Sequence, residues 1–246
     1  MIFGMAALSL GAAFWAAESP ATVPTKQIRL VLVGDSTVTD TAGWGLGFRK
    51  LLTADVECIN LAKGGRSSRS FRAEGHWDTV ADLKPDYVLI QFGHNDQPGK
   101  GPERETDAAT EFPENLARYV REARDAGATP ILVTSLTRRR FGNDGKIHSD
   151  LDPYVAGCRA AAEQTGAPLI DLHSRSIEFC NALGRDRCEQ ELSPRKDDGS
   201  YDSTHLTAHG SDLIAPLVAA ELVRVVPDLG PHIHRKAPAT EGTRNQ

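Results

Sequence analysis

Short apolar runs alternate along this sequence with segments in which apolar residues recur at helical spacing. The runs have the length and the β-branched content of strands, and we predict strands at residues 28–33, 56–61, 87–92, 131–134 and 169–171. Residues 113–127 place their apolar side chains on one helical face and end in Gly127, and a last helix is expected from about His209 to Val225. Strands that are apolar almost throughout are typical of a parallel sheet covered by helices on both faces. The pattern therefore predicts a single α/β domain.

Length and charge narrow the class of protein further. The chain has 246 residues, which is enough for the core of one domain, and its formal net charge is −5. The sequence has no stripe of basic residues, which argues against a nucleic acid as its partner. We place the folded domain at residues 26–228 and expect a polar C-terminal tail at residues 229–246.

The N-terminal segment differs from the rest of the chain. Residues 1–17 contain no charged side chain, and the polar stretch "ESPATVPTK" follows them. This pattern is typical of a signal-peptide core, although no Lys or Arg lies near Met1. We interpret residues 1–25 as a signal peptide or N-terminal extension and expect a secreted or periplasmic protein without stable membrane insertion. A membrane anchor and a buried N-terminal helix are the alternatives.

The four cysteines are Cys58, Cys158, Cys180 and Cys188. They allow three disulfide pairings, among which the sequence does not choose. Cys180 and Cys188 are close enough in sequence to close a short loop, whereas Cys58 lies in an apolar run and has the surroundings of a buried thiol. Because the chain contains no C-x-x-C pair, a cysteine zinc site is not favoured.

Polar motifs follow the first three predicted strands at the points where they end. The sequence "GDST" places Ser36 after the first strand, "LAKGGRSSRSF" follows the second, and "GHND" follows the third. In parallel sheets, ligands bind beyond the carboxyl ends of the strands, so these motifs share the edge where a site is expected. Ser36 alone is also well explained as a helix cap or turn residue.

The sequence "YDSTH" before the last predicted helix supplies partners for a nucleophilic serine. A serine hydroxyl needs a base, and histidine is suited to that role because it titrates near neutral pH. The imidazole needs a carboxylate on its other nitrogen, and Asp202 precedes His205 by three residues. A capping aspartate beside a surface histidine is the alternative explanation of this motif.

Hydrogen-bond donors for an oxyanion are present in the same motifs. Asn95 follows the third strand, Gly64 and Gly65 follow the second, and the N–H of Ser36 is expected at the start of a helix. Taken singly, the asparagine also fits a turn, and the glycines also fit a tight bend.

Taken in this order, the motifs resemble those of the SGNH (GDSL-type) hydrolases over about residues 28–225. The stretches "GDSTVTD", "GWG", "GGRSSRSF" and "GHNDQ" are most similar to the rhamnogalacturonan acetylesterase branch. The resemblance implies a flavodoxin-like three-layer α/β/α sandwich with a parallel five-stranded sheet, export, no cofactor, and removal of acetyl groups from a pectic or related polysaccharide. It further implies that Ser36 is the nucleophile, His205 the base and Asp202 the residue that orients it. The implied oxyanion hole consists of Ser36 N–H, Gly65 N–H and the Asn95 side chain, with Gly64 as the alternative glycine.

Residues that contact the substrate are predicted less directly. Arg66 and Arg69 lie beside the glycine motif and are candidates to pair with a uronate carboxylate, unless they are ordinary surface arginines. Trp44 is a candidate to stack on a sugar ring, although a tryptophan at a helix start also suits the core. The polar loop 135–150 after the fourth strand is expected to line the substrate groove or to be solvated, and His94 to point away from the site or to bond the loop.

Three alternatives stay open at the level of sequence. Asp202, His205 and His209 are spaced as possible metal ligands, but the H-E-x-x-H motif is absent. A catalytically silent carbohydrate-binding module on the same fold is the second alternative. A lipase, thioesterase or xylan-type acetylesterase with the same triad is the third, although the Gly-, Arg- and Ser-rich loops favour a small acyl group on a polar carrier. We expect the protein to act as a monomer on an acetylated polysaccharide or oligosaccharide.

Overall fold

The computed structural model describes residue 1 and residues 27–234. Its centre is a five-stranded parallel sheet with the strand order β2-β1-β3-β4-β5. The strands are β1 (Ile28–Gly34), β2 (Val56–Asn60), β3 (Tyr87–Gln91), β4 (Thr129–Val133) and β5 (Leu169–Ile170). The predicted α/β class and the parallel five-stranded sheet are confirmed, with strand limits that differ from the prediction by no more than two residues.

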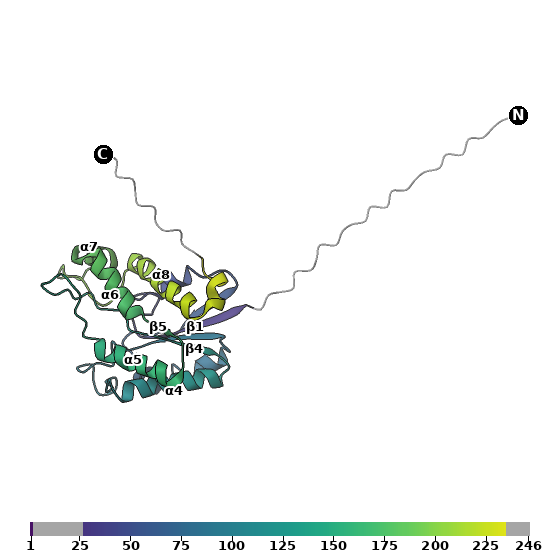
Figure 1. Cartoon of the computed structure of the whole chain (residues 1–246), viewed down its shortest axis with the longest axis horizontal. Coiled ribbons are helices and arrows are strands. Elements are labelled where there is room, and N and C mark those ends of the chain that lie inside the picture. The colour runs from purple at the N-terminus through teal and green to yellow at the C-terminus, as the bar shows by residue number, and fades with distance from the viewer. Residues whose placement is uncertain (2–26, 235–246) are drawn as a thin grey trace.

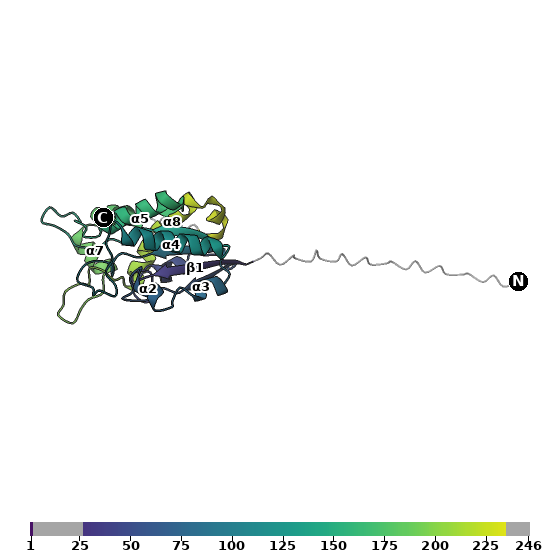
Figure 2. The same ribbon diagram turned by 90° about the horizontal axis from the view of Figure 1, so that it is seen from below.

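Both faces of the sheet are covered by helices, which makes the molecule a three-layer sandwich (Figures 1 and 2). In β1, Leu30 and Leu32 pack into the core on one face, and Val31 and Val33 pack into the core on the other. Because successive side chains of a strand point to opposite faces, burial on both faces requires an unbroken apolar run. This requirement explains why the strands were visible in the sequence.

One layer consists of α1 (Gly45–Arg49), α6 (Leu172–Leu183), α7 (Arg185–Leu192) and α8 (Ala208–Val225). The other consists of α2 (Ser70–Ala73), α3 (Thr79–Asp82), α4 (Glu111–Asp125) and α5 (Asp152–Thr165). Gly127, which has φ +83°, follows α4, and the Thr207 side chain accepts a hydrogen bond from Gly210 N–H at the start of α8. The two predicted helices are therefore present, with limits close to those expected.

The segment that follows β1 differs from the prediction. Ser36 was expected at the start of a helix, but residues 35–44 form turns and the first helix begins at Gly45. The cause is local, because the Asp35 carboxylate accepts hydrogen bonds from the N–H and the hydroxyl of Thr37 at 2.8 and 2.7 Å. Such side-chain bonds to nearby backbone favour a turn over a helix.

The predicted C-terminal tail begins too early. A 3₁₀ helix spans Pro227–His232, Leu229 is buried in the core, and Ile233 forms a bridge to Leu52. The His232 ring also lies 2.7 Å from Asp55. Residues 229–234 therefore belong to the domain, because they cover apolar residues of the layer that contains α1 and α8.

The predicted signal peptide at residues 1–25 lies outside the described residues, apart from Met1. Within the described part of the chain, no helix combines the length and apolarity needed to cross a membrane. The four cysteines are unpaired in the structure, and three of them are buried.

Candidate active site

The sequence motifs meet at the carboxyl edge of the sheet, where the strand order changes direction. The chain runs outward from β1 to β2 on one side and from β3 to β4 and β5 on the other. Such a change opens a crevice at the carboxyl ends of the two central strands, β1 and β3. Ser36 follows β1 and Asn95 follows β3, so the residues expected to do chemistry lie at this crevice.

Hydrogen bonds join Ser36, His205 and Asp202 in a continuous line. The Nε2 atom of His205 lies 2.9 Å from Ser36 Oγ, and its Nδ1 lies 2.8 Å from Asp202 Oδ2. The second carboxylate oxygen of Asp202 accepts the backbone N–H groups of Thr204 and His205 at 2.7 and 3.0 Å. This geometry suits a hydroxyl nucleophile, a base within reach of its proton, and a carboxylate that selects the tautomer of the base.

The charge of Asp202 is stabilised by these contacts. Partial burial raises the pKa of Asp202, but the hydrogen bonds from the His205 ring and from two backbone N–H groups outweigh it and lower the pKa to about 2. Asp202 is therefore ionised at every pH at which a histidine base works. An ionised carboxylate at Nδ1 favours a proton on that nitrogen, which leaves Nε2 free to accept the proton of Ser36.

The three donors predicted for an oxyanion hole are the N–H groups of Ser36 and Gly65 and the side-chain amide of Asn95. Among the described residues, the backbone N–H groups of Ser36 and Gly65 have no hydrogen-bond acceptor. The Asn95 amide donates one hydrogen to the carbonyl of Arg66 at 3.1 Å, which leaves its second hydrogen for a ligand. Gly65 has φ +77° in a turn closed by Arg66 N–H and Lys63 O, a conformation that favours glycine.

The alternative glycine, Gly64, also approaches the serine. A Cβ atom built on Gly64 would lie 3.7 Å from Ser36 Cβ, whereas one built on Gly65 would meet nothing within 4 Å. Gly64 therefore lies against the serine side chain, whereas Gly65 provides the left-handed backbone conformation of the turn.

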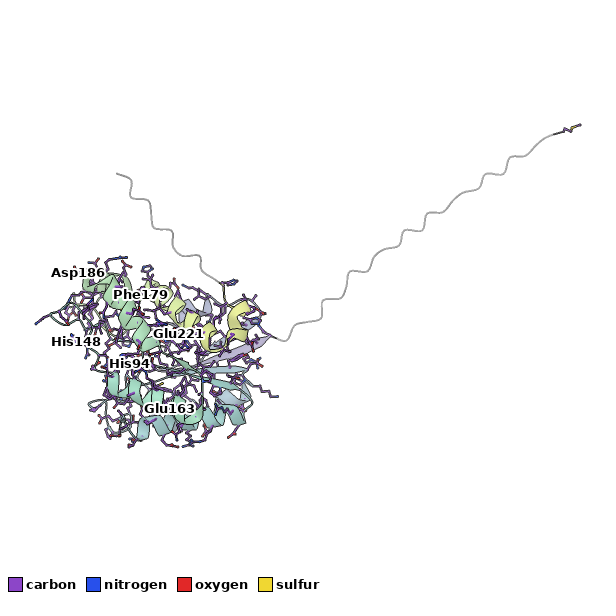
Figure 3. The ribbon with its side chains drawn as sticks, in the orientation of Figure 1. His94, His148, Glu163, Phe179, Asp186 and Glu221 are labelled. Carbon is purple, nitrogen blue, oxygen red and sulfur yellow. The ribbon has the colours of Figure 1, made fainter. Side chains whose placement is uncertain are left out.

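Three buried titratable side chains, Asp35, His94 and Asp96, are sequence neighbours of Ser36 and Asn95. His94, labelled in Figure 3 between the two helical layers, is 2% exposed, and its Nδ1 lies 3.4 Å from the fully buried Asp35. Next to it, Asp96 accepts hydrogen bonds from Ser68 N–H and Oγ, from Gly93 N–H and from the Thr106 hydroxyl. Burial raises the pKa of Asp96 to about 7, although the bonds from Ser68 and Thr106 act in the opposite direction.

The structure does not support a substrate contact at Trp44. Its side chain is fully buried, its Nε1 donates to Gln91 Oε1 at 2.9 Å, and its ring packs edge-on against Phe48. Gln91 in turn donates to the Thr37 hydroxyl at 2.7 Å. The prediction of sugar stacking is therefore wrong, since Trp44 is a core residue that supports the turn containing Ser36.

The two predicted uronate-binding arginines already have carboxylate partners. The Nε atom of Arg66 lies 2.8 Å from Glu74, and the guanidinium of Arg69 pairs with Glu111 and donates to Pro102 O at 2.7 Å. Both arginines are partly exposed near the glycine turn, so each would bind a uronate only in competition with its glutamate.

The structure does not bring Asp202, His205 and His209 together as ligands of a metal ion. Both ring nitrogens of His205 are occupied by Ser36 and Asp202, and His209 is exposed on the first turn of α8. Within residues 27–234, no group of three or more His, Cys, Asp or Glu side chains is arranged to bind a metal ion.

Two buried arginines in the loop after β4 were not predicted as site residues. Arg138 is 5% exposed and donates to Gln97 Oε1 and to Asp150, whereas Arg139 is 3% exposed and donates to the turn that contains Asp202 and His205. The available signal was the run "RRR" at the carboxyl end of a buried strand, which was interpreted only as a groove-lining or solvated loop.

Comparisons with known proteins agree with this geometry. Residues 32–213 match the model of the GDSL-like lipase/acylhydrolase family. The chain is 37% identical over 210 residues to the rhamnogalacturonan acetylesterase RhgT of Bacillus subtilis, with 79% of this chain and 89% of that protein covered. It is 34% identical over 198 residues to the probable rhamnogalacturonan acetylesterase YesY of the same organism, with 77% and 90% covered.

A solved structure has a similar fold. The chain superposes on protein YxiM of Bacillus subtilis with a TM-score of 0.69 and 30% identity, covering 82% of this chain and 57% of the other. The chain thus spans little more than half the length of that structure. The motifs, the sheet and the family match lead to one conclusion: the chain belongs to the GDSL-like lipase/acylhydrolase family, and it is a carboxylic ester hydrolase.

Proposed function

We propose that this protein is a serine esterase that removes O-acetyl groups from a pectic polysaccharide, rhamnogalacturonan, through an acyl-enzyme intermediate. The observation that carries the proposal is the continuous chain of hydrogen bonds from Ser36 through His205 to Asp202. The similarity to two proteins named as rhamnogalacturonan acetylesterases supports the substrate class.

In the acylation step, His205 Nε2 takes the proton from Ser36 Oγ as the oxygen attacks the acetyl carbonyl carbon. The carbonyl oxygen becomes an oxyanion next to Ser36 N–H, Gly65 N–H and the Asn95 amide. The imidazolium is stabilised by ionised Asp202 and then gives its proton to the sugar oxygen that leaves. The products of this step are the free sugar hydroxyl and an acetylated Ser36.

In the deacylation step, His205 removes a proton from a water molecule that attacks the acetyl carbonyl. The same donors stabilise the second oxyanion, and the proton returns to Ser36 Oγ as acetate leaves. The ring of His205 is 36% exposed on its side-chain surface, so water and a bulky polar carrier have access to the base.

The polar surroundings of the site favour a small acyl group. The loops beside Ser36 present Gly64, Gly65, Arg66 and Asn95, rather than apolar side chains that would line a channel for a long acyl chain. We therefore expect acetyl esters to be hydrolysed faster than octanoyl esters.

The first test is hydrolysis of p-nitrophenyl acetate by the wild type, by Ser36→Ala and by the matched control Ser200→Ala, each with and without EDTA. Ser200 is exposed and, among the described residues, its hydroxyl bonds only to Asp198, so its variant should keep full activity. We expect Ser36→Ala to lose activity and EDTA to have no effect. Full activity of the Ser36→Ala variant would contradict a serine mechanism, and so would loss of wild-type activity in EDTA.

The second test addresses the substrate. Acetate release from acetylated rhamnogalacturonan should be abolished by Ser36→Ala and should exceed release from acetylated xylan at equal acetyl content. Faster release from xylan, or faster turnover of p-nitrophenyl octanoate than of the acetate, would contradict the assigned substrate. No turnover of any ester by a folded wild type would instead indicate a silent binding module.

We further propose that the protein is exported and acts as a monomer. The charge-free residues 1–17 support export, and a polymeric substrate is more accessible outside the cell. The mass of the protein recovered from medium or periplasm should correspond to a chain shortened at its N-terminus, and light scattering should give the mass of one chain. An intact chain confined to the cytoplasm would contradict export.

A further inference from the structure

The loop after β4 contains three consecutive arginines with different surroundings. Arg138 and Arg139 are 5% and 3% exposed, whereas the Arg140 side chain is 56% exposed and pairs with Asp150 at 2.6 Å. A buried guanidinium is costly unless its donors are satisfied, so two such residues in one loop call for a physical reason.

The donors of Arg139 converge on the turn that contains the proposed base. Its Nη2 donates to the carbonyl of Asp202 at 3.0 Å and to the carbonyl of His205, and its Nη1 lies 3.5 Å from the carbonyl of Thr204. Its backbone N–H donates to the carbonyl of Ser203 at 2.8 Å. One residue of the β4 loop therefore contacts all four residues 202–205.

The Nε atom of Arg139 also has a hydrogen-bond partner. It donates to Ser193 Oγ at 2.7 Å, at the end of α7. Within the described part of the chain, no carboxylate lies within ion-pair distance of Arg139. Its partners are carbonyl and hydroxyl oxygens, so its geometry is set by the direction of these bonds and not by a mobile counter-ion.

Within the turn at residues 202–205, Asp202 Oδ1 accepts the N–H groups of Thr204 and His205, and these bonds set the shape of the turn without attaching it to the sheet. The turn lies outside any helix or strand, and its flanking backbone bonds are Asp202 N–H to Pro194 O and Leu206 N–H to Ala42 O, at 2.8 and 2.9 Å. These bonds fix the two ends of the turn. The bonds from Arg139 fix its middle relative to β4, and thus relative to the sheet edge where Ser36 lies.

From this arrangement we propose that Arg139 is the positioning residue of the base, and that its buried guanidinium keeps the Asp202–His205 turn in register with Ser36. The proposal rests on the proposed serine esterase function. Arg139 does not contact the reacting atoms and acts only through the carbonyls of the turn. Because a displacement of about 1 Å of a reacting group can cost about 100-fold in rate, loss of this support should appear in kcat.

The test compares Arg139→Met, Arg139→Lys and the matched control Arg140→Met in the full chain. For Arg139→Met we expect kcat for p-nitrophenyl acetate to fall about 100-fold with KM within about twofold of wild type. Arg139→Lys retains a charged donor but not the planar guanidinium, so its kcat should lie between those of the wild type and Arg139→Met. Arg140→Met removes only an exposed ion pair and should retain the wild-type kcat and KM.

A second readout separates positioning from a general loss of stability. The proton shared by His205 Nδ1 and Asp202 should give a strongly downfield NMR signal in the wild type and in Arg140→Met. This signal should be lost or broadened in Arg139→Met at temperatures well below its unfolding transition. A folded Arg139→Met protein with wild-type kcat and an unchanged signal would overturn the proposal.

Ser193→Ala provides a second test if Arg139→Met does not fold. If Arg139→Met is insoluble, Ser193→Ala removes one acceptor of the guanidinium and should lower kcat without raising KM, and an unchanged kcat in both Ser193→Ala and Arg139→Lys would overturn the proposal. If the wild type hydrolyses no ester, the proposed function fails, but the NMR signal still shows whether Arg139 orders the turn.

Discussion

The substitution Asp202→Asn tests the direction of proton transfer at the proposed site. Asp202 uses one oxygen to accept His205 Nδ1 at 2.8 Å and the other to accept two backbone N–H groups at 2.7 and 3.0 Å. In the variant, the amide oxygen must take the place that faces the two N–H groups, because an NH₂ group there would oppose both donors. The NH₂ group then faces His205 Nδ1.

The consequence is the wrong tautomer of the base. Facing a donor, Nδ1 has to be unprotonated, so the ring proton moves to Nε2, which lies 2.9 Å from Ser36 Oγ. A protonated Nε2 cannot accept the proton of the serine hydroxyl. In the comparable change in a serine protease kcat drops by about 10⁴-fold, and we expect a loss of about this size, which corresponds to about 5 kcal/mol of transition-state stabilisation.

The assay is steady-state hydrolysis of p-nitrophenyl acetate together with the rate of serine phosphorylation by an organophosphate. The matched control is Asp212→Asn, which removes the charge of a partly exposed aspartate that pairs with Lys50 at 2.8 Å on the same layer of the protein. Both rates should fall in Asp202→Asn and neither in the control. A folded Asp202→Asn enzyme within about tenfold of the wild-type kcat would refute the tautomer argument.

Two further predictions concern the neighbouring loop. Asn95→Ala should lower kcat by about 10²–10³-fold through the loss of one oxyanion donor; an unchanged kcat would remove Asn95 from the oxyanion hole. Asp96 has a pKa of about 7 when folded against an ordinary value of 3.8, so between these pH values the folded state binds more protons than the unfolded state, and the free energy of unfolding should fall as the pH rises. The free energy of unfolding of the wild type minus that of Asp96→Asn, measured by urea unfolding, should therefore fall as the pH rises from about 4 to 7, and a difference that does not change with pH would contradict the assigned pKa.

The predictable part of this protein depends on short-range rules. Strands buried on both faces must be apolar in succession, and helices between them must be apolar on one face, so a parallel sheet covered by helices on both faces could be predicted from residues 28–225. The ends of parallel strands lie at one edge, so Ser36 and Asn95 could be placed at the same crevice before their contacts were known. The motifs beside the strands were enough to indicate an ester hydrolase.

The sequence by itself thus determined the fold class, the side of the sheet that contains the site and the residue types available for its chemistry. Only the tertiary structure decided which polar residues face the crevice, because burial depends on packing between segments distant in the chain. Trp44 bonds Gln91 in the core, Arg66 pairs with Glu74, and Arg139 reaches 63 residues along the chain to the carbonyl of Asp202. Each of these partners is set by how the loops pack on the sheet, and no local pattern of residues specifies that packing.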